Sequence, residues 1–571
     1  MDEDLEQRVL ETAEEYALYN ALKHGADAQV GAIMGPMMGD NPEFREHGDE
    51  IPGVAGRAVG KVNGMGTEER RERLEELAPE RLEELEAEDE EDEHDLPDLP
   101  NAVDGEVKMR CAPNPNGPWH LGHARMPAVI GTYKERYDGE MLVRFDDTDP
   151  ETKRPDLDAY DAILEDIDYL GFEPDEVIKA SDRVETYYEH ARELIDLGGA
   201  YTCSCSGEAF SELKNDGEAC PHREKGVEET KEEFEAMVEG EYESGEMVLR
   251  VRTDIEHKNP ALRDWVAFRI IDTPHPREEA EAYRCWPMLD FQSGVDDHLT
   301  GITHIIRGID LQDSAKRQGF LYDYFGWEYP EVLHWGHVQI DAYDVKMSTS
   351  TIAEKIAAGE LEGWDDPRAP TLKSVRRRGI RGEAVTAAMV ELGTSTSDVD
   401  LAMSSIYAAN RELVDEETDR RFFVRDGEKL PLEGDLDVAH PPLHPNHEER
   451  GTRDIEAGDG VLVEPEDIPT ESERVWLKGL GCVRHEDGGF VATGDDIEAV
   501  REGGVDVIHW VPAASNVPLR LRTMEGDVSG HAERGVSDYE PDSLVQFERI
   551  GFARIDRHGE DEETVAYFAH P

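Results

Sequence analysis

The chain has 571 residues, of which 132 are Asp or Glu and 59 are Lys or Arg, so its formal net charge is −73. This balance excludes the broad basic surface by which most proteins attract a polyanion. The acid is spread over all regions, and 38% hydrophobic residues in patterned segments argue for a folded chain of three or four domains rather than a disordered one. We interpret the acid excess as adaptation to high salt, where the Debye length is about 3 Å and surface repulsion is largely screened.

The sequence carries no signal for a membrane or for secretion. No apolar run approaches the roughly 18 residues of a membrane span, and the acidic residues 1–6 lack the basic region of a signal peptide. Six Cys residues are too few for the disulfide framework of a secreted protein of this length. We therefore expect a soluble, cytoplasmic protein.

Four types of pattern follow one another along the chain. Helical periodicity predicts a helical N-terminal extension over residues 1–85. The acid run and the Pro residues that follow predict a linker over 86–102, although a solvated face explains the acid equally well. From residue 103 short strands alternate with helices, which predicts a doubly wound parallel sheet of the Rossmann-like kind. After about residue 420 short alternating runs between Gly and Asp turns predict β-barrels.

Two motifs, far apart in the chain, carry most of the functional signal. The first ends at His120, Gly122 and His123, where a turn after a strand-like run opens an amphipathic helix. Such a turn suits a phosphate, and Gly122 leaves room for a base or ribose. The second motif is the tract Lys346, Met347, Ser348, Thr349 and Ser350. Alone, the first pattern arises by chance and the second is compatible with a polar loop, but together they predict the two halves of an ATP site.

The residues around these motifs extend the pattern. Residues 110–125 (RCAPNPNGPWHLGHAR), 142–150 (LVRFDDTDP) and 363–379 resemble signatures of the glutamyl and glutaminyl branch of class I aminoacyl-tRNA synthetases, archaeal type. The resemblance covers roughly residues 100–430. It implies a Rossmann-like catalytic domain in two parts (103–200 and 285–350), an inserted acceptor-end domain (201–284), a helical stem-contact region (351–418) and anticodon-binding β-barrels (419–571).

The resemblance also implies a chemistry. It is that of a glutamate-tRNA ligase, which uses ATP with Mg²⁺ to form glutamyl adenylate and passes the glutamyl group to the 3′ end of tRNA(Glu). We expect a monomer, and the acid excess indicates a halophilic source. Whether tRNA(Gln) is also charged stays open. This chain has Thr349 at the position of the second Lys of the family signature. Archaeal members often resemble it in carrying Met-Ser-Thr-Ser there. Lys346 is therefore the first candidate for stabilising the departing pyrophosphate, and Lys355 the second.

Within this branch Arg307 separates glutamate from glutamine. It aligns with an Arg that glutamyl enzymes use in the amino-acid pocket, and a guanidinium matches a carboxylate with two hydrogen bonds but matches a neutral amide poorly. Arg110 aligns with a second pocket Arg, and Asp146 with the carboxylate that holds the substrate's α-ammonium. Structural salt bridges are the alternative for all three, and Leu289 stands where the family usually has Tyr. Glutaminyl-tRNA synthetase is the alternative assignment.

A cysteine and histidine cluster predicts a metal. Cys203, Cys205, Cys220 and His222 form a Cys-x-Cys and a Cys-x-His pair, which are ligand types suited to tetrahedral zinc. Reduced cysteines in a loop are the alternative. Some glutamyl enzymes resemble this arrangement in the domain that grips the acceptor end, and four protein ligands imply a structural rather than catalytic Zn²⁺.

A basic cluster predicts contact with nucleic acid. Lys373, Arg376, Arg377 and Arg378 form one of the few dense basic patches in this acidic chain. We expect them to contact tRNA phosphates, and a helix face that pairs with local acids is the alternative.

Two other functional classes fit less well. A nucleotidyltransferase acting on a small molecule would share the first motif but would not need the long β-rich C-terminal sequence, and neither would truncated relatives that modify a tRNA base. A non-catalytic acidic scaffold or RNA-binding protein would have lost one or more of His120, Gly122, His123 and Asp146, all of which are present.

Overall fold

The computed structural model describes residues 3–23, 28–40, 44, 51–66, 70–71, 73–74, 77–79, 81–82, 96–340, 342–494, 500, 504–559 and 563–571. The chain divides into two compact units, Met1–Asp95 and Leu96–Pro571. Most of the predicted linker lies outside the described residues. Its last part belongs to the second unit, because Tyr133 and Arg136 donate hydrogen bonds of 2.7 Å to the carbonyl oxygens of Pro97 and Leu96.

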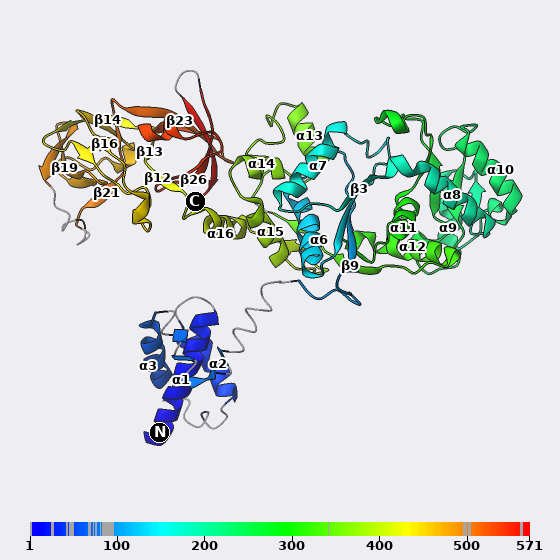
Figure 1. Ribbon diagram of the computed structural model, residues 1–571, viewed down its shortest axis with the longest axis horizontal. Helices are drawn as coiled ribbons and strands as arrows, with labels where there is room; N and C mark the ends of the chain where they lie inside the picture. Colours follow the sequence, from blue (N-terminus) through cyan, green and yellow to red (C-terminus); the bar gives the residue numbers. More distant parts are fainter. Residues whose placement is uncertain are drawn as a thin grey trace. The chain divides into compact units, whose positions relative to one another are not determined.

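The described part of the first unit is helical. Its long helices are α1 (Glu3–Lys23), α2 (Val30–Asp40) and α3 (Ile51–Asn63) (Figure 1). Val9, Ala13 and Ala17 recur at four-residue spacing on α1 and are fully buried, as expected for the apolar stripe of a packed helix. The buried carboxylate of Glu14 accepts a hydrogen bond from Lys61 at 2.6 Å, which compensates its burial.

A parallel sheet forms the centre of the second unit. Its strands are β1 (Lys108–Cys111), β2 (Glu140–Phe145) and β3 (Glu176–Lys179), in that order, and a parallel pair β8 (His304–Gly308) and β9 (Glu331–Trp335). The two groups adjoin where Thr303 donates a backbone hydrogen bond to Lys108 at 2.9 Å. The crossovers include the helices α6 (Arg125–Arg136), α7 (Leu157–Tyr169) and α12 (Gln312–Phe325). This confirms the predicted Rossmann-like fold class.

An antiparallel domain is inserted between the two strand groups. Its sheet has the order β4 (Ala200–Cys203), β5 (Val248–Val251), β6 (Val266–Ile270) and β7 (Cys285–Pro287). The helices α8 (Val184–Asp196), α9 (Gly207–Asp216) and α10 (Val227–Val238) accompany it. Tyr188, Phe234 and Phe268 pack with ring centroids 5.4 to 6.1 Å apart and form an aromatic core. The chain then returns through α11 (Leu289–Leu299) to β8.

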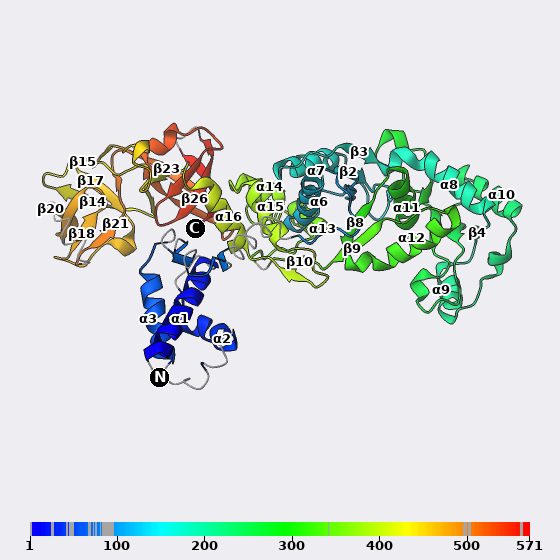
Figure 2. The same cartoon turned by 60° about the horizontal axis from the view of Figure 1, so that its bottom comes forward.

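A helical region follows the catalytic sheet. It contains α13 (Thr349–Ala357), α14 (Leu372–Arg377), α15 (Gly382–Glu391) and α16 (Met403–Val414), with a short parallel pair β10 (Val338–Gln339) and β11 (Val399–Asp400). Within the second unit, both views show α14 to α16 between the β-rich C-terminal region and the parallel sheet (Figures 1 and 2).

The C-terminal region contains two seven-stranded sheets. One has the order β12 (Asp419–Arg421), β25 (Leu544–Phe547), β26 (Gly551–His558), β27 (Thr564–His570), β23 (Asn516–Arg522), β24 (Asp527–Glu533) and β13 (Phe423–Arg425). The other has the order β21 (Asp506–Ile508), β18 (Arg474–Leu477), β19 (Gly481–Glu486), β20 (Gly489–Gly494), β14 (Glu428–Glu433), β17 (Gly460–Val463) and β22 (Val511–Pro512). A separate short pair is β15 (Val438–Ala439) with β16 (Ile455–Glu456).

The edges of both sheets are joined by the chain itself. In the first sheet the edge strands β12 and β13 are separated by Phe422 alone. In the second sheet the edge strands are β21, which ends at Ile508, and β22, which begins at Val511, so two residues separate them. A sheet whose two edges are adjacent in the chain curls into a barrel, which removes its exposed edges. The predicted β-barrels are confirmed.

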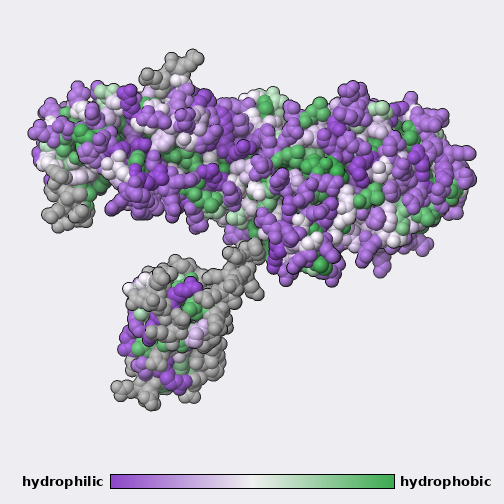
Figure 3. Space-filling view, in the orientation of Figure 1, coloured by the Kyte–Doolittle hydropathy of each residue, from purple (hydrophilic) through white to green (hydrophobic). Residues whose placement is uncertain are grey.

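The surface agrees with the composition. The face of the second unit that is visible in Figure 3 is mostly hydrophilic, with apolar residues in small separate areas. Among the described residues no helix combines the length and the apolarity that crossing a bilayer would require.

Candidate active site and its surroundings

The first motif lies at the turn after β1. His120 precedes the short 3₁₀ helix η2 (Leu121–Ala124), and its ring centroid lies 3.7 Å from that of His123. Burial lowers the pKa of His120 to about 4 and lowers the pKa of His123 well below its ordinary value, so both imidazoles are neutral at neutral pH. The Nδ1 atoms of both rings are buried without a hydrogen-bond partner in the protein. Each ring therefore keeps a polar atom for a ligand.

The two motifs meet at two glycines of the first. A Cβ atom on Gly122 would lie 3.2 Å from Nδ1 of His120 and 3.9 Å from Cε of Met347. A Cβ atom on Gly117 would lie 2.6 Å from Cγ2 of Thr349, closer than two carbon atoms can approach. Thr349 is the first residue of α13, and the first turn of a helix carries unpaired N–H groups that suit a phosphate. The fold thus joins the two predicted halves of the ATP site.

The loop of the second motif contains one available cation. Lys346 is exposed, and no carboxylate among the described residues lies within ion-pair distance of it. Lys355, the second candidate, forms an ion pair of 2.6 Å with Glu360. The hydroxyl groups of Ser348 and Ser350 share a hydrogen bond of 3.1 Å, which orders the loop at the start of α13. The geometry favours Lys346 as the cation for a phosphate.

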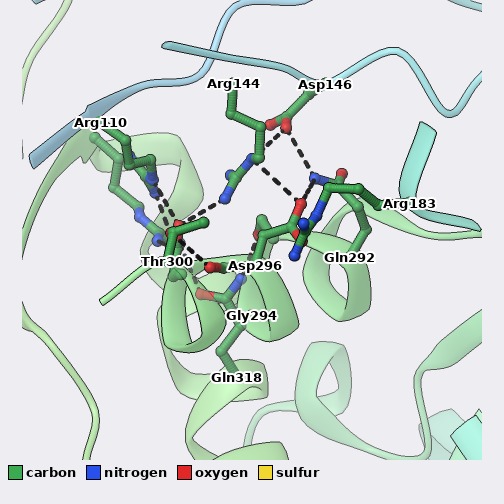
Figure 4. Close-up of polar contacts among 12 residues, drawn as sticks. Arg110, Arg144, Asp146, Arg183, Gln292, Gly294, Asp296, Thr300 and Gln318 are labelled. Carbon is green, nitrogen blue, oxygen red and sulfur yellow. Dashed lines mark hydrogen bonds and ion pairs between the residues drawn. The ribbon is translucent and has the colours of Figure 1, made fainter. Parts of the chain in front are cut away.

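Beside this site, arginines gather around a buried carboxylate (Figure 4). Arg110, from β1, donates to Asp297 through Nε at 2.9 Å, and Arg144, from β2, donates to the same oxygen through Nη1 at 2.7 Å. Arg307, from β8, has Nη2 3.9 Å from Asp297. The Nε atom of Arg144 also donates to Asp146 at 2.7 Å. Strand ends thus bring together all three residues predicted for the amino-acid pocket, Arg110, Asp146 and Arg307.

Arg307 is incompletely paired although it is buried. The residue is 7% exposed, and its Nη1 atom donates to Gln318 at 3.2 Å. Its Nε and Nη2 atoms have no hydrogen-bond partner. Burial, followed by the nearby charge of Arg110, lowers the pKa of Arg307. Two parallel N–H groups left unpaired in a buried guanidinium match the two oxygens of a carboxylate ligand.

The charges of this cluster do not cancel. A further guanidinium, that of Arg183, donates to Asp296 at 2.7 Å, and Tyr187 donates to the same carboxylate at 2.6 Å. The cluster therefore holds four guanidinium groups, from Arg183 and the three arginines above, and three carboxylates, from residues 146, 296 and 297. One positive charge is left over. An anionic side chain of the ligand would reduce the positive charge of this cluster by one unit, whereas a neutral amide would not.

The ATP motif and the arginine cluster share one loop. The backbone N–H of Asp146 donates to Pro113 at 2.9 Å, and Asn114 donates through Nδ2 to the carbonyl oxygen of Asp146 at 2.8 Å. Leu289, which stands where the family usually has Tyr, is the first residue of α11 and is 40% exposed. A ligand held by Asp146 therefore lies next to the loop that leads to His120.

The predicted zinc ligands converge in the inserted domain. The donor atoms of Cys203, Cys205, Cys220 and His222 all lie within 4.8 Å of one another. The Sγ atoms of Cys203 and Cys220 are 3.8 Å apart, and Sγ of Cys205 is 3.4 Å from Nδ1 of His222. Tetrahedral zinc with Zn–S bonds of about 2.3 Å would place two sulfur atoms about 3.8 Å apart. The donor set and its spacing fit this ion.

The basic cluster on α14 divides into exposed and buried members. Arg376 is exposed and Lys373 partly exposed, and both line a pocket of 890 Å³ beside the C-terminal barrel. Arg377 pairs with Asp365 at 2.7 Å and with a second carboxylate in β26. Arg378 is 1% exposed and donates to the carbonyl oxygens of residues 568 and 569. Because its side chain cannot reach an external phosphate, we withdraw Arg378 from the predicted tRNA contacts.

Three residues of the site were not predicted from the sequence. Arg144 lies inside the tract 142–150 that resembles a family signature, but nothing in the tract distinguishes it from a structural arginine. Asp297 and Gln292 lie on α11, and no motif marks them. Gln292 is fully buried and donates to Asp146 at 2.9 Å. The available signal was that most positions of one helix with buried apolar residues, Phe291 and Val295, are polar. These polar positions are 290, 292, 293, 296 and 297.

Comparison with known proteins assigns the chain to a family. Residues 106–416 match the family model described as tRNA synthetases class I (E and Q), catalytic domain, and residues 418–500 and 507–556 match two models for the anti-codon binding domain of that family. The chain is 73% identical over its full length to the full-length glutamate–tRNA ligase of Natronomonas pharaonis and 70% identical, also over both full lengths, to that of Haloarcula marismortui, both halophilic archaea. It is 44% identical to that of Methanosarcina mazei over 98% of each chain. The chain therefore belongs to the class I tRNA synthetases of the glutamyl and glutaminyl family.

Proposed function

We propose that this protein is a glutamate–tRNA ligase, which activates L-glutamate with ATP and transfers it to the 3′ end of tRNA(Glu). The observation that carries the choice of glutamate is Arg307, whose Nε and Nη2 atoms have no hydrogen-bond partner in a buried cluster with one excess positive charge. The relatives named above carry the same activity in their names. The glutaminyl alternative is not favoured, because a neutral amide would leave both the charge and the guanidinium uncompensated.

The activation step follows from the geometry of the two motifs. The α-carboxylate of glutamate attacks the α-phosphorus of ATP in line, and the bond to pyrophosphate breaks. The neutral imidazoles of His120 and His123 donate hydrogen bonds to phosphate oxygens, while Lys346 and the first turn of α13 stabilise the departing pyrophosphate. Magnesium enters with ATP as part of that substrate. No general base is needed, because positioning and charge stabilisation do the work.

The transfer step requires tRNA to span the molecule. We propose that the inserted domain holds the acceptor end, that the helical region contacts the stem, and that the C-terminal barrels bind the anticodon, in line with the family models matched there. Lys373, Arg376 and Arg377 are the proposed contacts to tRNA phosphates. The glutamyl group then passes from the adenylate to a hydroxyl group of the terminal ribose.

We further propose that the cluster of Cys203, Cys205, Cys220 and His222 holds a structural Zn²⁺. Ser204 hydrogen-bonds Nε2 of His222 at 3.1 Å, which leaves Nδ1 free to bind the ion. Mass spectrometry of the purified protein for metals should find one zinc per chain, and Cys220→Ser should lose it. A wild-type protein that contains no zinc after purification with zinc in the buffers would disprove the site.

One assay tests the function as a whole. Labelled glutamate and glutamine are offered separately with tRNA(Glu) or tRNA(Gln) at molar KCl. We expect glutamate on tRNA(Glu). Attachment to tRNA(Gln) as well would identify a non-discriminating enzyme, whereas attachment of glutamine, or of neither amino acid, would contradict the proposal.

A further inference from the structure

Gln292 occupies an unusual position in the arginine cluster. Its side chain, from α11, is fully buried, and Figure 4 shows it directed toward Asp146. Its Nε2 atom donates to Asp146 at 2.9 Å and lies 3.4 Å from Oδ2 of Asp296. Its Oε1 atom is buried and has no hydrogen-bond partner in the protein.

The orientation of this amide is fixed by its neighbours. Two carboxylates face one end of the side chain, and a carboxylate accepts hydrogen bonds but cannot donate them. The nitrogen must therefore face Asp146 and Asp296, because an oxygen there would meet two anions. Oε1 is consequently held on the opposite side, as an acceptor whose direction the protein has already determined.

An acceptor left unpaired in a buried position requires an explanation. Leaving such a group unsatisfied costs about 1–3 kcal/mol, and native proteins keep few of them. The same cluster contains unpaired donors, Nη2 of Arg144 and Nε and Nη2 of Arg307. Oδ1 of Asn114, whose Nδ2 donates to the backbone carbonyl oxygen of Asp146, is a second unpaired acceptor beside the cluster. Unpaired donors and unpaired acceptors together are complementary to a ligand that carries both an ammonium and a carboxylate group.

The carboxylate of Asp146 cannot satisfy an ammonium group alone. Its Oδ1 atom already accepts hydrogen bonds from Arg144 at 2.7 Å and from Gln292 at 2.9 Å. An ammonium group has three N–H donors, so a second acceptor from the protein is needed next to Asp146. Among the residues that the structure describes, Oε1 belongs to the amide that donates a hydrogen bond to this carboxylate.

We propose that Gln292 is a substrate-binding residue whose carboxamide oxygen accepts a hydrogen bond from the α-ammonium group of glutamate, beside Asp146. The proposal rests on the proposed function and adds one residue to those that recognise glutamate. It also gives Gln292 a second task, because the same amide holds Asp146 in place through Nε2. A structural residue would perform only the second task.

The test compares two ligands that differ only in the ammonium group. The sulfamoyl analogue of glutamyl adenylate carries it, and the glutaryl counterpart does not. Their affinities for the full chain are measured by calorimetry at molar KCl. For Gln292→Met we expect about tenfold weaker binding of the glutamyl analogue, the effect of one hydrogen bond to a charged group, and less than about twofold change for the glutaryl analogue.

Gln318→Met is the matched control. Gln318 is also a fully buried glutamine, but it accepts from Arg307 at 3.2 Å, at the other end of the ligand. Gln318→Met should weaken the binding of both analogues equally. Gln292→Asn, which keeps an amide but withdraws its oxygen, should repeat the selective loss if Gln292→Met does not fold. Equal loss of both analogues in the Gln292 variants, or no loss, would overturn this inference, whereas failure of the wild type to bind the glutamyl analogue would overturn the proposed function.

Discussion

The amino-acid pocket and the basic cluster on α14 are both rich in arginine, but they differ in what is left unpaired. In the pocket, Arg307 is buried with two nitrogens that have no hydrogen-bond partner. In the cluster, Arg378 is buried even more deeply, but it donates to Tyr407 at 2.9 Å and to backbone carbonyl oxygens of the last strand. Arg376, in the same cluster, is exposed. Sequence alone does not distinguish these three arginines. In the structure, Arg307 indicates a bound ligand, Arg378 a contact that holds the fold together, and Arg376 an external binding surface.

The largest expected effect comes from the unpaired guanidinium. Arg307→Cys would remove the proposed partner of the substrate's side-chain carboxylate and should lower kcat/KM for glutamate by roughly a thousandfold, since losing one member of a buried charged pair costs about 2–5 kcal/mol. The dissociation constant for ATP should change by less than about threefold, because His120 and Lys346 are untouched. Aminoacylation kinetics and nucleotide binding measure the two quantities.

A surface arginine provides the matched control for that change. Arg192 forms a two-pronged pair with Glu235 on the inserted domain, and Arg192→Cys should leave glutamate kinetics unchanged. If Arg307→Cys weakened glutamate and ATP equally, Arg307 would be a structural residue like Arg378, and the contrast between the two regions would fail.

Arg378 should behave in the opposite way. Arg378→Met would leave the carbonyl oxygens of residues 568 and 569 without donors and should lower the free energy of unfolding by roughly 3–5 kcal/mol. KM for tRNA in the protein that remains folded should not change. Chemical unfolding at molar KCl measures the stability. An intact stability with a raised KM for tRNA would return Arg378 to the tRNA contacts.

Much of the fold could be predicted, because it depends on local patterns. The strand and helix alternation after residue 103 and the Gly and Asp turns after residue 420 are periodic signals, and the structure has the expected sheet and barrels. The ATP motifs were also recognisable, since short tracts in sequence form them. Their contact through Gly117 and Thr349 was not, because it joins residues more than 200 positions apart.

The predicted site was incomplete for a related reason. Arg110 and Asp146 were found by alignment with a family, but their partners Asp297 and Gln292 come from one helix that enters the core after the inserted domain. Burial and unpaired atoms are properties of the folded chain, and composition does not encode them. The same limit applied to Arg378, whose neighbours in sequence are exposed or half-exposed while its own side chain is enclosed by the C-terminal strands.

Beside the basic cluster on α14 lies a buried acid whose ionisation makes the stability of the fold depend on pH. Asp166, on α7, is 3% exposed, accepts a hydrogen bond from the N–H of Trp119 at 3.3 Å, and has its pKa raised to about 7, chiefly by burial. A folded-state pKa above that of the unfolded chain means that the folded state binds more protons between about pH 4 and 7, so stability falls as pH rises through that window. Asp166→Asn should remove this loss of stability with rising pH.

The variant should therefore be more stable than the wild type by on the order of 1–4 kcal/mol at pH 8, and the difference should shrink toward zero near pH 4. Denaturation at several pH values and constant KCl tests this. Asp158→Asn, on the exposed first turn of the same helix, serves as control. A pH profile for Asp166→Asn that parallels the wild type would show that the carboxylate is ionised throughout.

The smallest effect is expected for Arg376, whose side chain is exposed to solvent. Arg376 lies over the ring of Tyr169 at 5.8 Å and lines the pocket beside the C-terminal barrel, so Arg376→Ala should raise KM for tRNA several-fold and leave stability unchanged. Because a phosphate contact is screened by salt, the loss should shrink as KCl increases, and the slope of log KM against log salt should fall by about one relative to the wild type. Arg378→Met should leave that slope unchanged. If both variants had the same slope, exposure would not separate an arginine that binds tRNA from one that holds the fold together.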